Sequence, residues 1–81
     1  MIFLIEYKRL HGRIVTFKTY NESERVKAEH ERLEIELDLS RRGIDHEVVL
    51  LEAADENALR KTHRRYFEDL SEFAKSLGDG S

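Results

Sequence analysis

The sequence contains no cysteine, no proline and no tryptophan, and only four of its 81 residues are glycine. Without cysteine there is neither a disulfide nor a cysteine-ligated zinc site, two of the usual means of stabilising a small domain. The longest apolar run, residues 1–5, is far shorter than the roughly 20 residues of a membrane-spanning helix. No basic segment precedes this run, so a secretory signal is not expected. We therefore expect a soluble, cytoplasmic protein that does not bind membranes.

The charged residues are numerous but nearly balanced. They make up 38% of the chain, with 14 Lys and Arg against 17 Asp and Glu, and the net charge is −3. Such a mixed surface gives no general attraction to nucleic acid or to anionic membranes. A chain of this length buries only about 60–65% of its unfolded surface. We therefore expect one small domain, with self-association as the remaining means of stabilisation.

The first 20 residues predict a β-hairpin. Residues 1–10 begin apolar, residues 14–20 are rich in β-branched and aromatic side chains, and His11-Gly12 marks the turn. A two-residue turn would place Glu6 opposite Phe17, whereas a three-residue loop would pair Glu6 with Lys18. We prefer the longer loop because one face then collects apolar side chains. These are Phe3, Ile5, Tyr7, Val15 and Phe17.

The next segment predicts a helix that begins after Asn21 and ends near Arg42. Asn21 and Glu24 are spaced as a capping box, and Gly43 suits the left-handed position after a helix. Residues 33–39 alternate with period two, as in a strand, but Leu and Glu are strong helix formers and we prefer helix. At about 100° per residue this helix carries two opposite apolar stripes. One contains Val26, His30, Leu33 and Leu37, and the other contains Ala28, Ile35 and Leu39.

The second half predicts a strand over residues 47–52 and a second helix. Asp55 caps this helix, which is expected to run from Glu56 to about Leu77 before Gly78. Its apolar stripe contains Leu59, Thr62, Tyr66, Leu70, Phe73 and Leu77. Residues 1–77 would then form the domain and residues 78–81 a flexible tail.

The element order is therefore β-β-α-β-α, an α+β fold. The first strand is the most apolar and belongs in the centre, which predicts a three-stranded antiparallel sheet of order 2-1-3 packed with two helices. The segment 48–63 resembles the strand-to-helix joints of ferredoxin-like and dimeric α+β-barrel proteins. The hairpin-first order of this chain departs from their βαββαβ order.

The strands predict self-association, because the first and third are apolar on both faces. If both helices cover the same face, the other face exposes an apolar surface that a second copy could bury. If the helices lie on opposite faces, one chain covers both sides by itself. We predict a homodimer, or binding to another protein, and expect the interface to contain Ile2, Leu4, Ile35, Leu39, Val48 and Leu50.

A basic run in the second helix supplies a second functional hypothesis, binding of phosphate or nucleic acid. Its four cations are Arg60, Lys61, Arg64 and Arg65. The simpler interpretation is a solvated face with local ion pairs. Residues 21–40 carry three positive and seven negative charges, and such an acidic neighbour would weaken attraction to nucleic acid.

The four histidines have no spacing typical of a metal site. His30 and His63 lie on the apolar stripes of their helices, so a metal or small-ligand site near this pair is a third hypothesis. No cofactor is predicted. Motifs of common enzyme classes are absent from the sequence. Glu6 is the one acid inside an apolar strand, where we expect an arginine or lysine partner. The sequence thus favours an interaction module over an enzyme.

Overall fold

The computed structural model describes residues 1–68. It contains three strands, β1 (Ile2–Lys8), β2 (Arg13–Tyr20) and β3 (Glu47–Glu52). The helices are α1 (Arg25–Arg42) and α2 (Glu56–Thr62), with short 3₁₀ segments η1 (Glu22–Glu24) and η2 (Arg64–Tyr66). The predicted α+β class and the element order are confirmed. No helix in residues 1–68 has the length and hydrophobicity of a membrane span.

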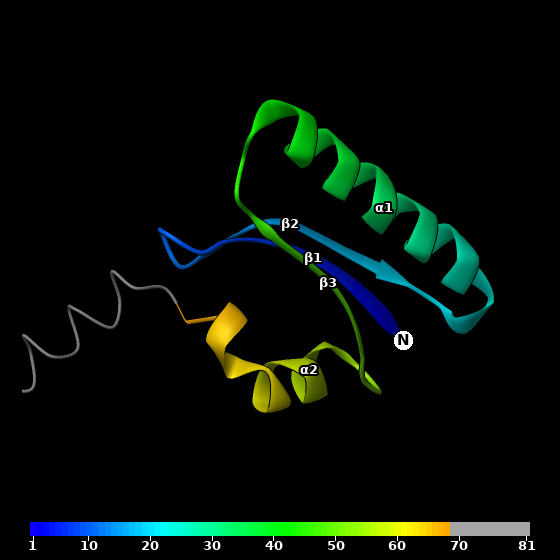
Figure 1. Cartoon of the computed structure of the whole chain (residues 1–81). Helices are drawn as coiled ribbons and strands as arrows, with labels where there is room; N and C mark the ends of the chain where they lie inside the picture. The colour runs from blue at the N-terminus through cyan, green and yellow to red at the C-terminus, as the bar shows by residue number, and fades with distance from the viewer. Residues whose placement is uncertain (69–81) are drawn as a thin grey trace, which may run out of the picture.

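The sheet has β1 in its centre, paired antiparallel to β2 on one side and to β3 on the other. This is the predicted 2-1-3 order. The two helices lie on opposite faces, with α1 on one side of the sheet and α2 and η2 on the other (Figure 1). The chain therefore adopts the arrangement in which it covers both faces of its own sheet.

The core consists of two layers because successive side chains of a strand point to opposite faces. The layer under α1 contains Ile2, Leu4, Tyr20 and Ala28. The layer under α2 and η2 contains Phe3, Ile5, Tyr7, Leu59 and Tyr66. Every side chain of β1 from Ile2 to Tyr7 is buried, as expected for the most apolar strand in the central position.

The hairpin register differs from both predicted alternatives. Glu6 pairs with Thr16, and Tyr7 pairs with Ile14, so the chain forms a bulge at Val15. The side chain of Val15 is displaced toward solvent and is 51% exposed. Phe17 pairs with Ile5 and shares the face of Phe3, Ile5 and Tyr7, as predicted, and the bulge places Ile14 on that face in the position expected for Val15.

The helix predicted from Asn21 to Arg42 begins as the 3₁₀ segment η1 and continues as α1, which ends at Arg42 as predicted. The Asn21 backbone N–H donates to Glu24 Oε1 at 3.1 Å, completing the capping box. Gly43 ends the helix with a φ of 65°, a left-handed conformation that glycine adopts without strain. The ambiguous segment 33–39 is helical throughout. Ala28 and Leu39 point into the sheet, so the stripe containing Ala28, Ile35 and Leu39 is the one that packs.

Helix α2 is shorter than predicted, since it ends at Thr62 and not near Leu77. The backbone leaves the helical conformation at His63, and Tyr66 of η2 then packs edge-to-face against Tyr7 with ring centroids 5.1 Å apart. Contacts with the sheet thus override the helical periodicity of the segment. Residues 69–81, which include the predicted stripe positions from Leu70 onward and the predicted tail, lie outside the described residues.

The layer under α2 should contribute strongly to stability. Leu59 is completely buried, so we expect Leu59→Ala to lower the free energy of unfolding by about 2–5 kcal/mol, through lost burial and a residual cavity. Leu10→Ala is the control, because Leu10 is 89% exposed at the hairpin turn, and its effect should stay within about 0.5 kcal/mol. Thermal unfolding followed by circular dichroism measures both. Equal effects would contradict the placement of α2 on this face.

Candidate functional site

The apolar residues predicted for a dimer interface are mostly used by the chain itself. Ile2 and Leu4 are buried in β1 beneath α1, and Leu39 is buried on the side of α1 that faces the sheet. Half-buried Ile35, Val48 and Leu50 pack against the same layer. The sheet face that was expected to receive a partner is therefore covered. Of these six residues, Val48 and Leu50 belong to β3, whose outer edge is not paired with another strand of residues 1–68.

Within residues 1–68, no strand pairs with the outer edge of β3. Met1 and Ala53 exchange two hydrogen bonds, of 3.0 and 3.1 Å, and so form a hydrogen-bonded pair at the start of the β1–β3 ladder. Such pairs alternate along antiparallel strands. The backbone N–H and C=O groups of Val49 and Leu51 therefore point to β1, whereas those of Val48, Leu50 and Glu52 point to the open edge.

The outer edge of β2 is a poorer template for strand addition. The bulge at Val15 interrupts it, and Lys18 lies in its middle; both features discourage pairing with another strand. By the same alternation the backbone of Thr19 points outward from β2. Strand β3 has neither a bulge nor a lysine, and its only charged residues are Glu47 and Glu52 at its two ends. The edge of β3 is thus less protected against pairing with another strand than the edge of β2.

The stripe of α1 that contains Val26, His30, Leu33 and Leu37 is exposed, because it lies opposite the stripe that packs on the sheet. Val26 is 79%, Leu33 50% and Leu37 48% exposed. His30 lies between them, with its Nε2 2.8 Å from Glu34 Oε1. These residues form an apolar strip on the side of α1 that points away from the sheet.

The basic run does not form one cationic surface. Arg60 lies 3.7 Å from Glu56 and stacks on Phe67, Arg64 pairs with Glu68, and Arg65 pairs with Glu47. Lys61 lies in the last turn of α2, before the chain turns at His63. Arg60, Lys61, Arg64 and Arg65 are thus divided between two short segments, and three of them have acidic partners within the described residues.

The histidine pair of the third hypothesis is divided by the sheet. His30 belongs to α1 and His63 follows α2, and these two helices lie on opposite faces of the sheet (Figure 1). Within residues 1–68 there is no cluster of three or more His, Asp or Glu side chains arranged to hold a metal ion. The two histidines therefore do not share a site.

Glu47 connects η2 to the sheet. The Tyr66 hydroxyl and the Arg65 guanidinium both donate to its carboxylate, and Arg9 lies 3.4 Å away. The hydrogen bond from Tyr66, followed by that from Arg65, holds the pKa of Glu47 below its ordinary value of 4.5. Burial, together with the acceptor Glu47, raises the pKa of Tyr66. Arg65, one of the four cations of the phosphate-binding hypothesis, is therefore engaged by Glu47.

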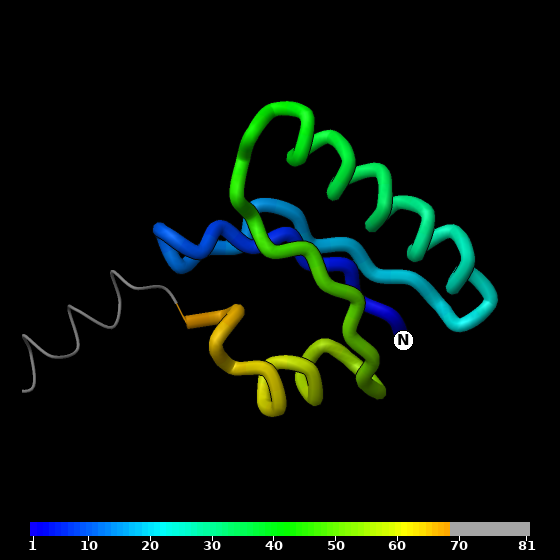
Figure 2. Tube along the Cα trace, in the orientation of Figure 1, coloured from blue at the N-terminus to red at the C-terminus, as the bar shows by residue number. Residues whose placement is uncertain are grey.

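Glu6 has a histidine and a threonine as partners, not the expected arginine or lysine. It is 8% exposed, accepts a hydrogen bond from Thr16 at 2.9 Å, and lies 2.7 Å from His46 Nδ1. His46 belongs to the connection 43–46 that returns from α1 to β3 (Figure 2). The cluster therefore joins this connection to β1 and β2. In the sequence, this cluster was indicated only by the presence of an acidic residue, Glu6, within an apolar strand.

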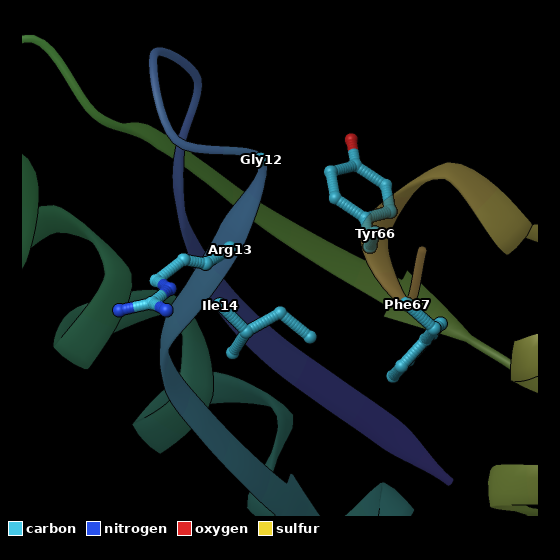
Figure 3. A pocket seen from close by; sticks show the side chains of 5 residues that line it. All are labelled: Gly12, Arg13, Ile14, Tyr66 and Phe67. Atoms are coloured by element: carbon cyan, nitrogen blue, oxygen red, sulfur yellow. The ribbon is translucent and has the colours of Figure 1, made fainter. Parts of the chain in front are cut away.

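A pocket of about 200 Å³ lies between the hairpin and η2. It is lined by Gly12, Arg13, Ile14, Tyr66 and Phe67 (Figure 3). Ile14 points toward Phe67, while the Arg13 side chain points the other way. The Tyr66 hydroxyl is bonded to Glu47, so the side chains facing the pocket offer little polar chemistry. It is also smaller than the roughly 300–1,000 Å³ of typical ligand sites.

The Glu47 cluster makes stability depend on pH. Because its pKa is lower in the folded chain, Glu47 contributes stability above pH 4.5 that is lost as pH falls through the folded value. We expect Glu47→Gln to lower the free energy of unfolding by about 1 kcal/mol at neutral pH. The difference from the unsubstituted protein should shrink below pH 4.5. Denaturant unfolding across this pH range measures it. Asp45→Asn is the control, since Asp45 is 87% exposed and should show no such dependence.

The Glu6 cluster predicts strong coupling between two side chains. His46→Ala leaves a buried carboxylate with Thr16 as its remaining partner, so we expect a loss of about 1–3 kcal/mol. The same substitution in a Glu6→Leu background should cost much less, because no buried charge is then left without its partner. A double-mutant cycle of unfolding free energies measures the coupling. Additive effects would show that the contact contributes nothing.

Comparison of the chain with protein-family models, with curated proteins and with solved structures finds no match. Its function therefore has to follow from its own surfaces and side chains.

Proposed function

We propose that the protein is a homodimeric interaction module, without catalytic activity of its own, in which β3 pairs antiparallel with β3 of a second copy. The single observation that supports this proposal is the open edge of β3. Three of its residues direct their backbone groups outward, and its apolar side chains are only half-buried. Exposed edges of this kind are templates for pairing with another chain.

A two-fold axis at Leu50 matches the strand to itself. Leu50 then lies opposite Leu50 of the second copy, and Val48 lies opposite Glu52. The outward groups of these residues supply about six hydrogen bonds between the chains. No acid faces an acid in this register, because Glu47 lies opposite Ala53. The charge pattern of β3 is thus compatible with self-pairing.

The pairing would also be self-limiting. Joining two β3 strands gives one continuous sheet whose outer edges are both β2. Each of these edges carries the bulge at Val15 and the central Lys18, which oppose further addition. A closed dimer therefore follows, and not an open fibre. The predicted interface members Val48 and Leu50 take part through their backbones, while the other four stay in the core of each subunit.

The side-chain clusters favour assembly over catalysis or phosphate binding. The carboxylates of Glu6 and Glu47 are engaged with neighbouring side chains. Arg60, Arg64 and Arg65 are paired with acids, so a phosphate group would have to compete with these contacts. Binding of phosphate or nucleic acid is therefore less well supported than self-association.

The test removes one outward hydrogen-bond donor without changing a side chain. The chain is prepared by chemical synthesis with an N-methyl group on Leu50, whose N–H points away from β1. We expect the unmodified protein to be a dimer by size-exclusion chromatography with light scattering at ~100 μM. The N-methyl-Leu50 protein should be a monomer with an unchanged circular dichroism spectrum.

N-methylation of Thr19 is the matched control, because this N–H points outward from the opposite edge. The Thr19 derivative should remain a dimer. An unmodified protein that is monomeric, or an N-methyl-Leu50 protein that is still dimeric, would overturn the proposal.

A further inference from the structure

We propose that the α1 helices of two copies pack side by side, antiparallel, across the two-fold axis of the β3 dimer. This inference rests on the proposed pairing of β3 and adds a second contact to it. A two-fold axis between two antiparallel strands is perpendicular to their sheet. Both α1 helices would therefore lie on the same face of the joined sheet and run in opposite directions.

The position of α1 on the sheet would bring the two helices close together. Helix α1 makes its closest approach to β3 and β1, and Arg25 at its start forms an ion pair with Glu52 at the end of β3. Neighbouring strands are about 4.8 Å apart. A helix above β1 and β3 would then lie about two strand spacings, roughly 10 Å, from its copy. Packed helices have their axes about 8–10 Å apart.

The side of α1 toward the outer edge of β3 carries a ridge of alternating charge. Its members are spaced at intervals of four, three and four residues and therefore lie on one side of the helix. They are Arg25, Glu29, Arg32 and Glu36. The contact between Arg25 and Glu52 shows that this side faces β3. The other side of α1 contains Glu31, which accepts hydrogen bonds from Lys18 and Tyr20 of β2.

An antiparallel copy of this ridge matches it in charge. The ridge is positive, negative, positive and negative along the chain, so a reversed copy presents the opposite charge at every position. A two-fold axis between Glu29 and Arg32 places Glu29 beside Arg32 of the second copy, and Arg25 beside Glu36 of the second copy. Opposite charges on facing helices favour pairing and select its orientation. A parallel pair would instead place like charges side by side.

The strand pairing and the charge pattern require nearly the same axis. Helix α1 runs from Glu52 toward Glu47, where the connection 43–46 enters β3. Leu50 lies two residues from Glu52, a distance of about 6.6 Å along the strand. At about 1.5 Å per helical residue, this distance leads from Arg25 to residues 29–30. The axis at Leu50 thus passes α1 where the charge pattern places it, and this agreement selects a second copy as the occupant.

The inner members of the ridge have little ionic contact within their own chain. In residues 1–68, Glu29 forms no ion pair, and the carboxylate of Glu36 lies 3.9 Å from Arg32 Nε. This Nε atom is buried and has no hydrogen-bond partner in that part of the chain, which is unfavourable. Arg25 already has two acidic partners. The two contacts between Glu29 and Arg32 of the other copy should therefore contribute most.

The test uses two variants that are complementary only to each other. Glu29→Arg places an arginine beside Arg32 of the second copy, and Arg32→Glu places a glutamate beside Glu29. Each variant alone has like charges at both contacts, whereas a heterodimer of the two has opposite charges. In an equimolar mixture, native mass spectrometry should give an equilibrium constant for heterodimer formation about tenfold or more above its statistical value. Effects within each chain cancel in this comparison.

Lys27→Glu and Glu34→Arg form the matched control pair. They make the same changes of net charge, but on the side of α1 toward β2. Their mixture should contain the statistical proportion of heterodimer, which is half of all dimers. Circular dichroism checks that each of the four variants is folded.

A statistical mixture of the Glu29→Arg and Arg32→Glu proteins would overturn the inference. An equal excess of heterodimer in the control mixture would also overturn it, because net charge alone would then explain the excess. Either result would leave the pairing of β3 intact, provided that the unmodified protein is a dimer and the N-methyl-Leu50 protein a monomer. A monomeric unmodified protein would instead overturn the proposed function, and this inference with it.

Discussion

The central strand β1 must be covered on both faces and paired along both edges, because its side chains are apolar on either side. This requirement explains the main features of the fold. Strands β2 and β3 occupy its two edges, α1 covers one face, and α2 with η2 covers the other. The two α-helices of residues 1–68 meet the requirement by lying on opposite faces of the sheet. The sheet surface that could have received a partner is then already buried.

The polar groups of β1 are satisfied by segments that come later in the chain. Glu6 contacts Thr16 and His46, and the Tyr7 hydroxyl donates to the backbone carbonyl of Arg65 at 3.2 Å. Buried polar groups without such partners would cost several kcal/mol each. The bulge in β2, the path of the 43–46 connection and the early end of α2 are all compatible with these contacts. The clusters of titratable side chains thus stabilise the fold, and the surfaces left for function are backbone edges and helix faces.

The two remaining surfaces have different chemistry. The edge of β3 offers hydrogen-bonding backbone groups and is uncharged between its two terminal glutamates. The outer stripe of α1 offers apolar side chains bordered by charged residues of both signs. The first surface has the chemistry that an added strand requires, which is the basis of the proposed self-association. The first lies in the plane of the sheet and the second on the outer side of α1, so the two surfaces are separate in space.

Local patterns determined the order of elements, both ends of α1, the cap of α2 and the central position of β1, because caps, turns and periodicity act over a few residues. The helical state of residues 33–39 also followed from local preferences. The hairpin register, the end of α2 and the partners of Glu6 were decided by contacts between residues distant in the chain. Which stripe of α1 packs depended likewise on the sheet it meets. Whether the two helices cover one face of the sheet or both was also decided by tertiary packing, which local sequence does not encode.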